Sequence, residues 1–197
     1  LFCDELLNKY REDTRIRHIG GSNFQMGKKW GNNSYYFSNL THVWGWASWR
    51  RAWRDYDVEL SNYKNIELLS VFNSIFNNNL IADEWNSIFN QLLVNKIDTW
   101  DYQLTITNLL NNGLSIIPNV NLIKNIGFGP NATHTFDTNN KFSNQKTEKL
   151  YQIKHPVLIL PQKEADLLTM NKEFDVKKRW RRARRKFIRK FKFWKRY

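Results

Sequence analysis

The chain has 197 residues, of which 41% are hydrophobic and 15% aromatic. This length and composition are enough for one folded domain with a sizeable core, and they exclude a disordered protein. No run reaches the roughly 18 consecutive apolar residues of a membrane-spanning helix. The net charge of +13 comes from residues 177–197, which hold 13 Lys and Arg and no acid, so residues 1–176 are neutral and we expect no basic nucleic-acid cleft there.

The N-terminal residues predict a piece of an α/β sheet. A helix comes first, because apolar residues recur along one side of it: Phe2, Leu6, Leu7 and Tyr10. Residues 15–19 then predict a short strand, and the Gly-Gly turn after it lacks the spacing of a phosphate-binding loop. The chain opens directly in a helix, so we expect it to be the later part of a longer protein. Its single cysteine, Cys3, cannot form an internal disulfide and fits a reducing compartment.

A Trp-rich stretch over residues 44–54 has the sequence WGWASWRRAWR and follows a strand predicted at residues 35–37. Read as a helix from Ala47, it would place the tryptophans at 46, 49 and 53 on one face and arginines on a neighbouring face. Two interpretations stay open, an aromatic core helix and the wall of a pocket that stacks on flat or sugar-like ligands. The acidic triplet DYD at residues 55–57 has the letters of a metal motif, but it follows a helix rather than a strand and fits an exposed turn better.

Three more helices and a strand are predicted further along the chain. Residues 60–79 and 83–95 both carry apolar residues at helical spacing, and a run of three Asn separates the two helices. The third helix begins near Asp98, ends at Gly113 and leads into a strand at residues 114–118.

The best acid/base candidate is Asp101, with Asp98 behind it. Asp101 lies in the first turn of the third helix beside Trp100, where a carboxylate is held rigidly and partly shielded from water, as a general base needs. The simpler alternative is that both carboxylates only cap the helix. The four histidines show no metal-ligand spacing, and His134 lies in a glycine-containing loop.

The end of the chain contains an apolar segment and a basic tail. Residues 157–160 are apolar, stop at Pro161 and predict an edge strand or a docking segment. We divide the chain into residues 1–170, a folded domain, and residues 171–197, a tail in which aromatic residues recur at helical spacing among Lys and Arg. Such a basic amphipathic helix is typical of attachment to an anionic membrane surface, with nucleic-acid binding and a plain solvated tail as alternatives. The residues expected to contact the membrane are Trp180, Arg181, Phe187, Phe191 and Trp194.

Three motifs follow one another in the chain: SYYFSNLTHVWGWASWRRAW, KIDTWDYQLT and GLSIIPNVNLIKNIGFGPNATHT. In this order they resemble the C-terminal half of bacterial family-2-like glycosyltransferases, which are nucleotide-diphospho-sugar transferases of the GT-A type, some of them labelled haemolytic-protein-like. The resemblance covers roughly residues 1–170. It implies a partial GT-A mixed-sheet α/β fold, rich in helices, whose nucleotide-binding strands and acidic Asp-x-Asp metal motif lie upstream of Leu1.

The resemblance also implies roles for individual residues. Asp101 would deprotonate the acceptor hydroxyl as it attacks the anomeric carbon, with inversion at that carbon. His134 would help the upstream acids to bind a divalent cation, Mg²⁺ or Mn²⁺, which neutralises the leaving diphosphate. The residues that would border the sugar or acceptor pocket are Trp44, Gly45, Trp46, Arg50 and Trp100.

The implied function is transfer of a sugar from a nucleotide-diphosphate sugar to a saccharide or lipid-linked acceptor, in the synthesis of envelope polysaccharide or glycolipid. Such an enzyme would work in the cytoplasm, peripherally on the inner face of the membrane, where the basic tail would hold it. A rival of another class is a non-catalytic module that binds membranes or polyanions through this tail.

Overall fold

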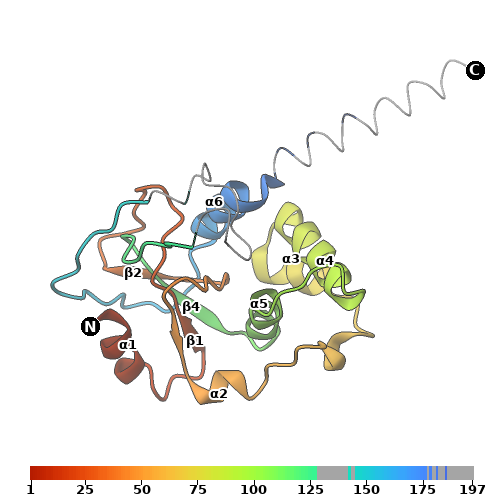
Figure 1. Ribbon diagram of the computed structural model, residues 1–197, viewed down its shortest axis with the longest axis horizontal. Helices are drawn as coiled ribbons and strands as arrows, with labels where there is room; N and C mark the ends of the chain where they lie inside the picture. Colours follow the sequence, from red (N-terminus) through yellow and green to blue (C-terminus); the bar gives the residue numbers. More distant parts are fainter. Residues whose placement is uncertain (128–141, 143–144, 177, 179–180, 182–184, 186–197) are drawn as a thin grey trace, which may run out of the picture.

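Helices and a small mixed sheet make up the protein, and its computed structural model describes residues 1–127, 142, 145–176, 178, 181 and 185 (Figure 1). The strands are β1 Ile16–Ile19, β2 Tyr35–Ser38, β3 Ala47–Ser48 and β4 Leu114–Pro118. The helices are α1 Phe2–Lys9, α2 Arg50–Trp53, the 3-10 turn η1 Ser61–Tyr63, α3 Leu69–Phe76, α4 Asn79–Leu93, α5 Asp101–Leu110 and α6 Lys163–Phe174. The predicted α/β class is confirmed.

The sheet has the strand order β2-β4-β1-β3, with the parallel pair β1 and β4 in the middle and antiparallel strands at both edges. Its two faces have different covers. Tyr35 and Phe37 of β2 point to the side covered by α1, where they pack around Leu6, whereas Tyr36 points to the opposite side and packs with Ala165 of α6. Because both faces are covered, every residue of β1 and β2 is buried.

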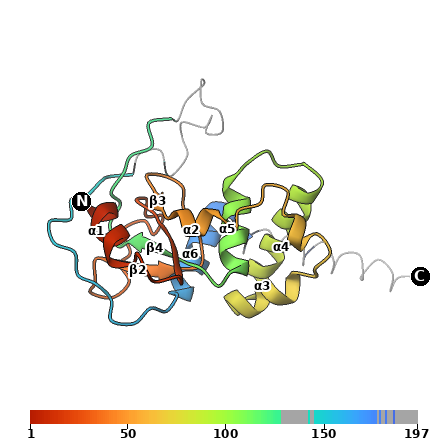
Figure 2. The same ribbon diagram turned by 90° about the horizontal axis from the view of Figure 1, so that it is seen from below.

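A second core lies among the helices α3, α4 and α5, which Figure 2 shows beside the sheet rather than over it. Phe72, Trp85 and Ile106 come from these three helices, and each is at most 3% exposed. The Asn run separates α3 from α4 as predicted, because Asn77 ends α3 in a left-handed conformation and Asn78 caps α4. Helix α4 therefore starts four residues before the predicted position.

The prediction of one helix from Ala47 through the Trp-rich stretch is wrong. Ala47 and Ser48 form β3 and pair with β1, Trp49 is extended with φ −117° and ψ 150°, and only the four residues of α2 are helical. The indole N–H of Trp49 donates to the carbonyl of Leu7, which holds this side chain over α1. Pairing with the sheet has outweighed the helical spacing of the tryptophans.

The ends of α5 also differ from the prediction. Trp100 occupies the N-cap position without a side-chain cap, so neither Asp98 nor Thr99 caps this helix. Gly113 does not reverse the chain after α5, because the left-handed residue is Asn112, with φ 53°. Gly113 is instead required by packing, since a Cβ there would lie 2.2 Å from Cδ of the buried Arg17.

Helix α6 was not predicted, because half of its buried positions are polar and its apolar stripe is weak. Its buried residues are Ala165, Asp166, Thr169 and Met170. The helix continues through residues 171–174 and so crosses the predicted division of the chain at residue 170. Among the described residues, no helix is both long and apolar enough to cross a bilayer.

Candidate functional site

Four aromatic side chains from three segments form a cluster that we call the aromatic platform: Trp46, Trp53, Tyr56 and Trp100. The ring centroid of Trp46 lies 5.7 Å from those of Trp53 and Trp100, which are themselves 6.0 Å apart. Tyr56 packs on Trp53 at 5.1 Å. Trp46 and Trp100 remain 36% and 41% exposed, so solvent reaches part of their rings. Large aromatic surfaces of this kind suit the apolar C–H face of a sugar ring.

A glycine turn decides which tryptophan joins the platform. Gly45 has φ +61°, and a Cβ at this position would lie 2.6 Å from a methyl group of Ile123. The turn sends Trp46 to the platform and Trp44 in another direction, where its ring contacts Phe24 at 5.2 Å. The structure therefore brings together two of the predicted pocket residues, Trp46 and Trp100, and separates Trp44 from them.

A buried histidine supports the platform from the sheet side. The ring of His18, in β1, stacks on Trp46 with centroids 5.6 Å apart and planes 23° apart. Its Nε2 lies 3.0 Å from the carbonyl oxygen of His42, to which it donates. Burial lowers the pKa of His18 to about 4, so the ring is neutral at physiological pH. His18 thus fixes the position of Trp46 without adding a charge beneath it.

The carboxylate of Asp101 lies at the N-terminus of α5, next to the platform. Its Oδ1 accepts a hydrogen bond from the backbone N–H of Tyr102 at 2.9 Å and another from the hydroxyl of Thr99. Among the described contacts, Oδ2 has no hydrogen bond. Burial, followed by the charge of Asp101 and then that of Asp57, raises the pKa of Tyr56, which shows that Asp101 is within electrostatic reach of the platform. Two hydrogen bonds hold Oδ1 in place and Oδ2 is free, an arrangement that suits a general base.

The second predicted carboxylate, Asp98, is exposed and takes no part in these hydrogen bonds. It lines a pocket of about 130 Å³ between α4 and α5, together with Thr99 and Gln103. Asp98 therefore shares Thr99 with the surroundings of Asp101, but it makes no described hydrogen bond to that carboxylate or to Tyr102.

The arginines of the Trp-rich stretch have different roles. Arg50 is exposed in the first turn of α2, and no described ring contact of the platform involves it. Arg51 is structural, because its guanidinium donates to four backbone carbonyls around the end of α1 and stacks on Trp49 at 4.4 Å. Buried Arg17 of β1 forms an ion pair with Asp55 at 2.6 Å.

The acidic triplet at residues 55–57 does not form a metal site. Asp55 pairs with Arg17, and Asp57 accepts the backbone N–H groups of Glu59 and Ser61 ahead of η1. Among the residues that the structure describes, no three His, Cys, Asp or Glu side chains come together as ligands. The described residues alone therefore do not fit a divalent cation. His134, the predicted ligand, lies outside the described residues.

Most of the predicted membrane contacts also lie outside the described residues: Trp180, Phe187, Phe191 and Trp194. Arg181 is described, and it is helical and exposed.

Comparison with family models, with curated proteins and with solved structures found no match for this chain. The assignment of the candidate site therefore depends on the geometry of its residues alone. Trp53, Tyr56 and His18 are not among the pocket residues predicted from the sequence. Trp53 and Tyr56 are three residues apart at the end of α2, and that spacing was the only signal available; His18 becomes part of the site only because β1 lies beneath Trp46.

Proposed function

We propose that this chain is the acceptor-side part of a glycosyltransferase. The observation that supports the proposal best is the position of Asp101 directly after Trp100, whose exposed ring lies 5.7 Å from that of Trp46, and within electrostatic reach of Tyr56. A sugar that stacked on these rings would bring its hydroxyl groups near the carboxylate of Asp101. The Oδ2 atom of this carboxylate is free to accept a proton.

In the proposed reaction, an acceptor hydroxyl attacks the anomeric carbon of a nucleotide-diphosphate sugar. As the new carbon–oxygen bond forms, Asp101 takes the hydroxyl proton, and the bond between the anomeric carbon and the diphosphate breaks with its electron pair leaving on the diphosphate. Attack from the opposite side to the leaving group inverts the anomeric configuration. The platform holds the sugar in place and excludes water from one side of it.

The finer parts of the proposal concern the fold, the cation and the location. In the proposal the mixed α/β sheet is the later part of a GT-A fold, whose nucleotide-binding strands would lie upstream of residue 1. A Mg²⁺ or Mn²⁺ ion would be held mainly by acids upstream of residue 1, with His134 as the ligand from this chain. The basic residues of the tail would attract the enzyme to the anionic inner face of the cytoplasmic membrane, where lipid-linked acceptors are found.

The test uses the complete gene product, incubated with a panel of nucleotide sugars and acceptors, with products detected by mass spectrometry. Asp101→Asn should lower turnover at least about 100-fold. Asp98→Asn is the matched control, since it removes an equal charge three residues away, and it should retain turnover. Trp100→Ala should act mainly on the KM for the acceptor.

Near-normal turnover in Asp101→Asn would refute the assignment of the base. If no donor and acceptor pair gives a product with the unmodified protein, the rival is favoured, a non-catalytic module that binds membranes or polyanions through the tail.

A further inference from the structure

An apolar segment at residues 151–161, which we call the strap, runs beside the edge strand β2 and is joined to it through Tyr35 and Phe37. It carries four of the most exposed large hydrophobic side chains of the described residues: Tyr151 91%, Val157 95%, Leu158 69% and Leu160 65%. Side chains scattered singly on a surface need no explanation, but four within ten residues form a patch, and such patches mark interaction surfaces.

The exposure is not the result of a loose segment, because the strap is fastened at both ends. Ser34 and Lys154 exchange hydrogen bonds of 2.9 and 2.8 Å, and the N–H of Gln162 donates to the carbonyl of Phe37 at 2.8 Å. Between them, His155 bonds to Tyr35 and pairs with Glu5 of α1 at 3.2 Å. The protein therefore holds the apolar side chains outward on a fixed support.

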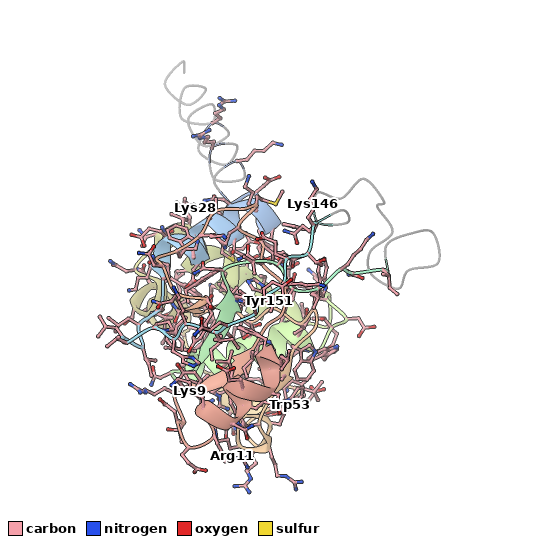
Figure 3. The ribbon with its side chains drawn as sticks, turned by 90° about the vertical axis from the view of Figure 1, so that its left-hand side faces the viewer. Lys9, Arg11, Lys28, Trp53, Lys146 and Tyr151 are labelled. Carbon is pink, nitrogen blue, oxygen red and sulfur yellow. The ribbon has the colours of Figure 1, made fainter. Side chains whose placement is uncertain are left out.

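The segment that contains the strap carries more basic than acidic residues. Residues 145–162 contain three lysines and one acid. Figure 3 looks onto this end of the molecule and shows Tyr151 near its centre, with Lys9 below it and Lys28 and Lys146 above it. Exposed apolar side chains on a segment that also carries lysines complement a surface that is apolar inside and anionic outside.

We infer that the strap is a second membrane contact, which places Val157, Leu158 and Leu160 in the outer layer of an anionic bilayer. A protein partner fits less well, since a stable interface buries roughly 800 Å² on each side, more than four side chains offer, whereas each apolar group that enters a bilayer contributes separately. Among the described contacts, the backbone groups of residues 157–159 make no hydrogen bond, whereas the carbonyl of Leu160 takes part in the bridge between Pro161 and Phe37. Insertion therefore reaches only the hydrated headgroup region, where water still satisfies the free groups.

The contact is independent of sugar transfer and of the basic tail, and the test separates it from both. An environment-sensitive fluorophore is attached at position 158 in a Cys3→Ser, Leu158→Cys variant of the whole chain. Val94→Cys in the same background is the matched control, because Val94 is 60% exposed and lies at the end of α4, in the other half of the molecule. With vesicles of phosphatidylcholine and phosphatidylglycerol, emission should shift to the blue at position 158 and stay unchanged at position 94.

A second measurement does not depend on the label. Replacing Val157, Leu158 and Leu160 together by serine should lower vesicle affinity at least about tenfold, because three apolar groups no longer leave water. The control changes three other exposed apolar residues, all before α5 in the chain, to serine, and it should have little effect: Val58, Ile66 and Val94. The inference is overturned if the label at position 158 stays in water while the protein sediments with vesicles, or if light scattering shows a dimer that shields this label without lipid.

Discussion

Three buried titratable groups predict how stability changes with pH. Burial lowers the pKa of His18 to about 4, and burial together with the nearby His18 lowers the pKa of His42 to about 3. Burial raises the pKa of Asp166 to about 6, despite hydrogen bonds from Ser38 and Asn39. These shifts act in opposite directions.

The histidines take up protons only on unfolding, so their contribution to stability is complete above pH 6.5 and is lost as the pH falls toward 4 and 3. Asp166 releases its proton on unfolding, so its contribution is complete below pH 3.8 and is lost as the pH rises through 6. When the pH falls from 7 to 5, the two histidines together lower the free energy of unfolding by about 4 kcal/mol, and Asp166 raises it by about 1 kcal/mol. The net loss of stability is about 3 kcal/mol.

Urea unfolding followed by tryptophan fluorescence at pH 7 and pH 5 measures this difference. In His42→Gln the loss of unfolding free energy between pH 7 and pH 5 should fall to about 1 kcal/mol, because only His18 then opposes the contribution of Asp166. In Asp166→Asn it should grow to about 4 kcal/mol, because the opposing group is gone. Equal losses in the unmodified protein and in both variants would refute the assignment of pH dependence to these groups.

Two further predictions concern packing around β1 and α1. Gly113→Ala should cost about 1–3 kcal/mol of unfolding free energy, because the new methyl group would meet Arg17, whereas Gly127→Ala, where the nearest atom is 3.1 Å away, should change it little. A wild-type urea midpoint for Gly113→Ala would show that Arg17 moves aside freely. Arg51→Met should cost about 3 kcal/mol, because carbonyls around the end of α1 lose their charged donor, and Arg54→Met on the exposed surface should cost under about 0.5 kcal/mol. Similar values for the two arginine variants would contradict the structural role of Arg51.

Local sequence determined much of the secondary structure. The stripe of α1, the strands at residues 16–19, 35–38 and 114–118, and the Asn break between α3 and α4 follow from spacing and capping, which depend on neighbours in the chain. Residues 157–160, predicted as an edge strand or a docking segment, do not form a strand, and only Pro161 after them makes a bridge with Phe37 of β2.

Tertiary contacts decided the rest. The Trp-rich stretch has helical spacing, but Ala47 and Ser48 pair with β1 instead. This pairing, together with the turn at Gly45, directs Trp46 onto His18 and toward Trp53. The sequence alone identified Trp46, Trp100 and Asp101 as candidates. Only the folded chain brings them together, because a site built from β3, α2 and α5 depends on long-range packing that no local spacing encodes.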